Sequence, residues 1–134
     1  MDTGKSALGL DGNVAAALGY PIGIIAIISL IMEKENRFVK FHALQSILLH
    51  VAAIVLMIAV WVIGAILMVA GIAASAATNS GAGVGLFSSL FFLLWIAFLA
   101  LYVLALIMAA VKAYGAAYFK LPVIGNMAEK FANK

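Results

Sequence analysis

The stretch NRFVKFHALQSILLHV, residues 36–51, joins a charged turn to a long hydrophobic run. On a helix, with ~100° between neighbouring residues, Phe38, Phe41 and Gln45 share one side. A second side carries a stripe of polar side chains: His42, Ser46 and His50. The stretch therefore predicts a helix that enters a membrane with a polar stripe, and the rest of the chain is organised around it.

The composition excludes an ordinary soluble domain. Of the 134 residues, 67% are hydrophobic and 10% are charged, and the mean hydropathy is +1.22. Soluble domains are about half apolar and about a quarter charged. The absence of cysteine excludes disulfides and thiolate metal sites. No cationic region precedes a short apolar core, so we expect no cleavable signal peptide.

Hydrophobic runs of about the ~20 residues that a bilayer crossing requires predict an all-α polytopic membrane protein with three transmembrane helices. We expect these helices over residues 14–32, 38–70 and 86–113. Residues 71–85 are small, polar and uncharged, which predicts a flexible loop. Residues 1–13 predict a short flexible or surface tail, and residues 114–134 predict an interfacial tail that either lies on the membrane or frays.

Small residues predict where the helices pack. Gly19 and Gly23 have the GxxxG spacing that lets helices approach closely, and Ala105 and Ala109 form a second small-residue face. Pro21, between the two glycines, should kink the first helix or set its start.

Aromatic and basic residues predict the membrane interfaces. At the start of the second helix, Arg37 and Lys40 are expected to face lipid headgroups, and Phe38 and Phe41 to face acyl chains. Near the end of the third helix, an interfacial belt is expected from Tyr114 and Tyr118.

The basic residues also predict an orientation in the plasma membrane. With three crossings, only Lys5 lies on one side, and the other side holds the remaining cations: Lys34, Arg37, Lys40, Lys112, Lys120, Lys130 and Lys134. The positive-inside rule then places the N-terminus outside and the C-terminus in the cytoplasm. Lipid explains this basic balance, and nothing indicates a nucleic-acid partner.

The two histidines do not predict a metal site or a cofactor. His42 and His50 lie eight residues apart, or ~12 Å along a helix, which is too far for one ion. Ser46 has a histidine four residues away on either side, but no carboxylate in the hydrophobic runs is placed to orient a base. We therefore expect no enzymatic activity.

Two interpretations of the polar stripe remain open. His42, Gln45, Ser46 and His50 could line a proton or ion pathway, because histidine titrates near neutral pH. Alternatively, they hydrogen-bond to neighbouring helices, as polar residues within membranes commonly do. Three helices cannot enclose a pore, so conduction would require several copies or partner subunits.

Two segments resemble a known family: NRFVKFHALQS and, later in the chain, GAAYFKLPVIG. The family consists of small bacterial and archaeal membrane proteins of unknown function, grouped with the Tic-complex import-channel component of the chloroplast inner envelope. The resemblance spans roughly residues 15–125 and is carried by Tyr20, Pro21, Arg37, Phe38, Phe41, His42, Ala43, Gln45, Ser46, Gly115, Tyr118 and Pro122. It implies a helical subunit related to a protein-conducting channel.

The first functional hypothesis is therefore a non-enzymatic subunit of a multi-helix membrane assembly, with translocation of polypeptide or another solute as its extension. Its partners would be the lipid bilayer and either further copies of the chain or another membrane protein. The second hypothesis is a homo-oligomeric ion or proton channel lined by the second helix. A third is a structural or lipid-interacting membrane protein.

Overall fold

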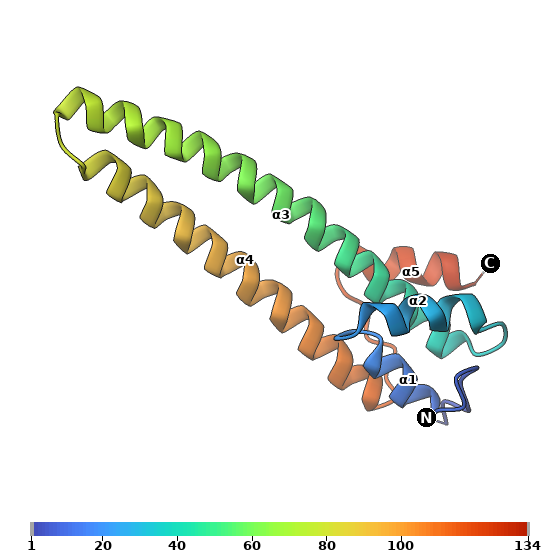
Figure 1. Cartoon of the computed structure of the whole chain (residues 1–134). Helices are drawn as coiled ribbons and strands as arrows, with labels where there is room; N and C mark the ends of the chain where they lie inside the picture. Colours follow the sequence, from blue (N-terminus) through green and yellow to red (C-terminus); the bar gives the residue numbers. More distant parts are fainter. Residues whose placement is uncertain (1, 134) are drawn as a thin grey trace. The chain divides into compact units, whose positions relative to one another are not determined.

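The computed structural model describes residues 2–133, and these fold into helices joined by short connections (Figure 1). The helices are α1 (Gly12–Leu18), α2 (Gly23–Met32), α3 (Arg37–Thr78), α4 (Ala82–Tyr114) and α5 (Ile124–Ala132). The expected all-α class is confirmed for the described residues. The chain forms two compact units, the first within Met1–Ala52 and Val103–Lys134 and the second over Ala53–Tyr102.

Two of the helices in the described residues, α3 and α4, are long and apolar enough to cross a membrane. A third crossing is not confirmed, because residues 14–32 do not form one helix. α1 ends at Leu18, and α2 begins only at Gly23. Pro21 lies in the break and has no amide hydrogen to donate to a helical carbonyl. With ten residues, α2 is ~15 Å long, about half the thickness of the hydrocarbon core.

The expected loop over residues 71–85 is mostly helical. α3 continues to Thr78 and α4 begins at Ala82, so the connection is a turn of residues 79–81 (Figure 1). Asn79 adopts a φ of 47°, in the left-handed region that asparagine tolerates. Alanine is the strongest helix former, and the alanines of residues 70–77 extend α3 to this turn.

In the second unit, each long helix has a seam of less exposed residues that repeats at alternating steps of four and three. On α3 the seam consists of Ala53, Met57, Val60, Gly64, Leu67, Gly71 and Ala74; on α4 it consists of Val84, Ser88, Phe91, Trp95, Phe98 and Tyr102. A repeat of 3.5 residues is the signature of coiled-coil packing. The two helices of this unit therefore pack as an antiparallel hairpin.

Glycines let α3 and α4 approach closely along this seam. A Cβ atom added to Gly64 would lie 2.3 Å from Cε2 of Phe91, so the Phe91 ring fills the space that glycine leaves. Trp61 packs against both Phe91 and Trp95, with ring centroids 5.8 and 5.9 Å apart. Nearer the turn, a Cβ atom on Gly83 would lie 2.7 Å from the Gly71 carbonyl oxygen.

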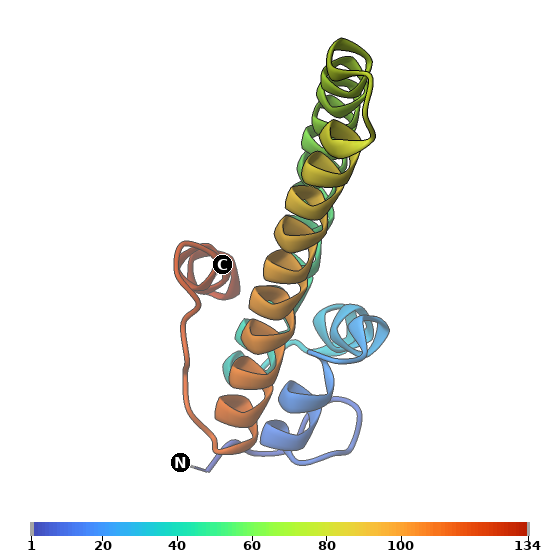
Figure 2. The ribbon, with the colours of Figure 1, turned by 90° about the vertical axis from the view of Figure 1, so that its left-hand side faces the viewer.

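In the first unit, α5 and the α1–α2 pair lie on different sides of the ends of α3 and α4 (Figure 2). Phe41 of α3 packs with Ala128 and Ala132 of α5, and Leu44 and Leu48 extend this contact. The described part of the expected interfacial tail therefore includes a helix that is packed against α3.

Residues 2–11, where a short flexible or surface tail was expected, form an ordered loop. Lys5 and Asp11 pair through a backbone bridge and a 2.6 Å ion pair. The hydroxyl oxygen of Thr3 accepts a hydrogen bond from the Asn13 amide at the start of α1. The side chain of Asn13 donates in turn to the carbonyl oxygen of Tyr114, at the end of α4. The loop thus belongs to the same unit as the C-terminal segment.

Candidate functional site

The most concentrated polar chemistry of the described residues lies inside the first unit, on the first turns of α3. The side chains of His42, Gln45 and Ser46 are fully buried there, together with Tyr20 from the α1–α2 break. Buried polar atoms cost free energy unless they are hydrogen-bonded. Their partners therefore indicate what this polar cluster does.

Both ring nitrogens of His42 are bound. Nε2 lies 3.1 Å from the carbonyl oxygen of Ala117, and Nδ1 lies 2.9 Å from the Tyr20 hydroxyl. A carbonyl oxygen only accepts, so Nε2 carries the proton and donates to Ala117. In the neutral ring Nδ1 is then the acceptor, and the Tyr20 hydroxyl donates to it. The two contacts together specify one tautomer of a neutral imidazole.

Gln45 uses both ends of its amide. Its Nε2 donates to the Tyr20 hydroxyl oxygen at 2.7 Å and to the Phe119 carbonyl oxygen at 2.9 Å. Its Oε1 accepts from the Leu121 amide at 3.0 Å. Tyr20 thus accepts from Gln45 while it donates to His42, so every hydrogen in this chain of bonds has a partner.

Ser46 and His50 continue the polar stripe along α3. The Ser46 hydroxyl donates to the carbonyl oxygen of Gly19 at 2.7 Å, and His50 Nδ1 donates to the Ser46 carbonyl oxygen at 2.8 Å. A Cβ atom on Gly23 would lie 3.6 Å from Nε2 of His50. The imidazole of His50 therefore packs directly against the start of α2.

The backbone groups that bind His42, Gln45 and the Ser46 hydroxyl all lie outside the helices. The α1–α2 break and residues 115–123 expose peptide groups that have no helical partner, and peptide groups away from water must be satisfied within the protein. Gln45 and Ser46 supply partners for groups of Phe119, Leu121 and Gly19, and His42 adds a second donor to the Ala117 carbonyl oxygen, which also accepts from the Phe119 amide. The hydrogen bonds of His42, Gln45 and Ser46 thus join two irregular segments to α3, rather than the neighbouring helices that the hydrogen-bonding interpretation named.

The residues expected at the membrane interface divide into two groups. Phe38 and Phe41 are 3% and 2% exposed, so they do not face acyl chains. Their rings pack against His42 with centroids 4.6 and 4.9 Å apart, and both also contact the ring of Tyr118. The other group remains partly or largely exposed: Arg37, Lys40, Tyr114 and Tyr118.

The residues expected to pack helices are arranged differently from a GxxxG face. Gly19 follows α1 and Gly23 opens α2, so the two glycines lie on different helices, with an exposed Pro21 between them. A Cβ atom on Gly19 would lie 3.4 Å from Cβ of Ala26, so this glycine lets α2 approach the break. On α4, Ala109 is fully buried and Ala105 is half-buried.

The charged turn before α3 holds a second polar cluster, which sequence reasoning did not identify. Glu33 is 7% exposed, and its carboxylate accepts from the amides of Ala7 and Asn36. The Asn36 side chain caps α3 by accepting from the Val39 amide, and it donates to the carbonyl oxygens of Thr3 and Lys5. Asparagine ahead of a long helical run is a typical N-cap signal, so this role could have been found in the sequence.

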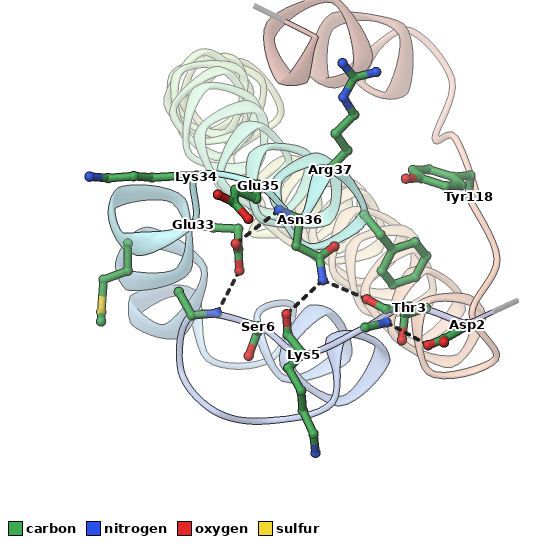
Figure 3. A pocket seen from close by; sticks show the side chains of 14 residues that line it. Asp2, Thr3, Lys5, Ser6, Glu33, Lys34, Glu35, Asn36, Arg37 and Tyr118 are labelled. Atoms are coloured by element: carbon green, nitrogen blue, oxygen red, sulfur yellow. Dashed lines mark hydrogen bonds between the residues drawn. The ribbon is translucent and has the colours of Figure 1, made fainter.

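This turn and the N-terminal loop border an open cleft of about 870 Å³ (Figure 3). Figure 3 shows Glu33 and Asn36 directed towards the N-terminal loop, whereas Arg37 extends away from it. No group of three or more His, Asp or Glu side chains in the described residues could hold a metal ion. Glu33 and Asn36 of this cleft therefore bind backbone groups of the chain itself, and the charged side chains among the described residues do not converge on a metal site.

Taken with the composition, the two long apolar helices are typical of a small helical membrane protein. Residues 7–128 match the model of the magnetosome magnetite crystal formation protein family, so the chain belongs to that family. None of the solved structures matches the chain.

Similar proteins include two UPF0132 membrane proteins from archaea. One, from Methanocaldococcus jannaschii, is 40% identical over 96% of this chain and 96% of its own length. Another, from Archaeoglobus fulgidus, is 37% identical over 88% of this chain and 92% of its own length. The expected small archaeal membrane family is thus found, whereas nothing supports the expected relationship to the Tic complex.

Proposed function

We propose that the chain is a non-enzymatic subunit of a multi-helix membrane assembly. The observation that carries the proposal is the distribution of charge: Ala53–Tyr102 contains no Asp, Glu, Lys, Arg or His. At ~1.5 Å per residue, its helical segments, residues 53–78 and 82–102, are about 39 and 32 Å long. These lengths suit a hydrocarbon core of ~30 Å. The uncharged hairpin would cross the bilayer.

The orientation follows from the same distribution. All eight Lys and Arg residues lie outside Ala53–Tyr102, as do all five Asp and Glu residues. A hairpin of two crossings returns the chain to the side on which it started. The positive-inside rule then places both termini in the cytoplasm. This replaces the outside N-terminus that three crossings required.

Assembly is supported by what the hairpin leaves uncovered. Ala73 and Ala77 on α3 are exposed and have the small-xxx-small spacing that lets a further helix approach closely. Two helices cannot enclose a path through the bilayer by themselves. The family is described as forming magnetite crystals in magnetosomes. In such a process this chain would act as a subunit of the assembly.

The competing proposal is a homo-oligomeric ion or proton channel lined by the second helix, with His42, Gln45, Ser46 and His50 along its pore. The described contacts favour the subunit. His42, Gln45 and Ser46 are fully buried and hydrogen-bonded within their own chain, and the half-buried His50 donates to the Ser46 carbonyl oxygen. Lining a pathway would require them to exchange these bonds for water. Translocation of polypeptide or another solute would be a property of the whole assembly.

Native mass spectrometry of the protein, extracted gently from its own membrane, tests the subunit proposal. We expect a homo-oligomer or a complex of fixed stoichiometry with a second membrane protein. The double variant A73L/A77L should shift the homo-oligomer towards monomer, while A59L, at another exposed alanine of α3, should not. A monomer from native membranes, also at high protein-to-lipid ratio, would contradict the proposal.

A further inference from the structure

A groove of about 400 Å³ lies in the first unit, between the start of α3, residues 118–120 and α5. Its basic side chains are Arg37 and Lys120, its acidic one is Glu129, and Phe41 and Tyr118 supply aromatic surface. This volume is within the usual range for small-ligand sites, ~300–1,000 Å³. The hydrogen bonds of His42, Gln45 and Ser46 do not involve the charged side chains that line this groove.

The two cations of the groove differ in their partners. Lys120 pairs with Glu129 at 2.8 Å, so its charge is largely balanced. The Arg37 guanidinium makes no hydrogen bond and has no carboxylate within ion-pair distance among residues 2–133. Guanidinium presents a planar fork of donors that matches phosphate geometry. Arg37 therefore carries the unbalanced positive charge of the groove, and its side chain is also the better suited of the two to bind phosphate.

Tyr118 adds a hydroxyl beside this charge. Its ring is held in place against Phe38 and Phe41, with centroids 5.1 and 5.4 Å apart. Desolvation raises the pKa of Tyr118, and the nearby positive charge of Arg37 partly opposes this shift. The hydroxyl therefore keeps its proton at neutral pH and can donate a hydrogen bond to an oxyanion.

A second, smaller groove shares Arg37 and adds further cations. Lys34 and Lys40 line it together with Glu35. Taken together, the two grooves carry four cations and two carboxylates, so the surface around Arg37 is net positive. This charge favours an anionic ligand over a zwitterionic one.

The neighbouring surface of α5 favours a lipid as the source of the phosphate. Met127 and Phe131, one helical turn apart, are 44% and 46% exposed, whereas Ala128 and Ala132 of the same helix are buried against α3. An apolar outer face beside a cationic groove matches a molecule with acyl chains and an anionic head.

We propose that this groove, which we call the Arg37 groove, binds the phosphate headgroup of an anionic phospholipid. Arg37 makes the main contact with the phosphate, the Tyr118 hydroxyl donates a second hydrogen bond, and the acyl chains lie along Met127 and Phe131. The proposal goes beyond the assembly role and holds whether or not the hairpin self-associates.

Native mass spectrometry of the full chain in detergent, titrated with phosphatidylglycerol or phosphatidylcholine, tests this site. We expect wild type to retain phosphatidylglycerol selectively. R37Q should weaken that binding about fivefold, which is the effect of one cation near an anionic surface. R37K, which keeps the charge but loses the fork, should weaken it about twofold and serves if R37Q is unstable.

The matched control is K112Q, which makes the same change in net charge. Lys112 is exposed in the last turn of α4 and lines neither groove, so K112Q should bind phosphatidylglycerol like wild type. Equal losses in R37Q and K112Q would overturn the proposal in favour of general charge attraction. Equal retention of the two lipids would overturn it too. Displacement of phosphatidylglycerol by ~10 mM inorganic phosphate would identify a free-phosphate site instead.

Discussion

The side-chain oxygen of Gln45 accepts a hydrogen bond from the backbone amide of Leu121, 76 positions later in the sequence, at 3.0 Å. Leu121 lies in the non-helical segment between α4 and α5, where no helical carbonyl is available to its amide. One glutamine of α3 thus binds the connection that brings α5 back to the same helix. The stability of this connection should depend on that side chain.

Q45M should release residues 117–123 while α3 and α4 remain helical. Methionine keeps the length of the side chain but leaves the Leu121 amide and the Phe119 carbonyl without their partners. An unsatisfied buried group costs ~1–3 kcal/mol, so the Leu121 amide should exchange at least about fivefold faster. Hydrogen exchange followed by mass spectrometry measures this rate.

The control for Q45M is I47M, which changes a partly exposed apolar residue two positions along α3. It should leave exchange in residues 117–123 unchanged. Unchanged exchange in Q45M as well would show that the glutamine does not hold this segment.

Substitution by alanine should destabilise the protein at one buried serine and not at another. The Ser46 hydroxyl donates to the Gly19 carbonyl oxygen, whereas the Ser29 hydroxyl, on α2, has no hydrogen-bond partner among residues 2–133. S46A should lower the free energy of unfolding by ~1 kcal/mol because it leaves a buried carbonyl unpaired. S29A removes an unpaired hydroxyl, so it should be neutral or stabilising by up to ~1 kcal/mol.

Thermal unfolding of both serine variants in the same detergent compares them directly. Each variant loses one oxygen atom and makes the same change in composition. Destabilisation of S29A to the extent of S46A would contradict the assigned hydrogen bonding.

The sequence predicts the all-α class and the apolar cores of α3 and α4, because long uninterrupted apolar runs have few other structures available to them. It does not predict that helix continues through residues 71–78. Gly71 and Ser75 are typical of loops, but here they serve the hairpin: Gly71 admits α4, and the Ser75 hydroxyl accepts from the Val84 amide. Both roles depend on the facing helix.

The polar stripe on α3 is visible in the sequence, but its partners are not. His42, Gln45 and Ser46 bind backbone groups at Ala117, Phe119 and Gly19, and any residue type presents such groups. The seam of the hairpin is hidden for a different reason. In an almost wholly apolar segment, hydrophobicity does not distinguish the inward positions from the outward ones.

Gly125 should tolerate no side chain. A Cβ atom there would lie 2.6 Å from Cβ and 2.7 Å from Cα of Lys120, and 2.9 Å from Oε1 of Gln45. G125A should therefore destabilise the packing of α5 by ~1–3 kcal/mol, which is the usual cost of overpacking. The matched control is G85A on α4, where a Cβ atom would meet nothing within 4 Å.

G85A should stabilise the protein by ~0.5–1 kcal/mol, since alanine favours helix over glycine. Chemical unfolding in mixed micelles, followed by the near-ultraviolet signal of Tyr118 and its neighbours, reports the difference. Equal stabilities of G125A and G85A would mean that Gly125 does not approach Lys120 and Gln45 as closely as described.

The position of the termini can be tested with single cysteines, because the chain has none of its own. D2C and K130C lie in the charged unit, and G81C lies in the α3–α4 turn with open space around it. If the uncharged hairpin crosses the membrane twice, a membrane-impermeant maleimide added to intact cells should label G81C and spare both D2C and K130C. Permeabilised cells should label all three, which controls for reactivity. Three crossings would put D2C and K130C on opposite sides, so labelling of D2C without K130C in intact cells would refute the hairpin.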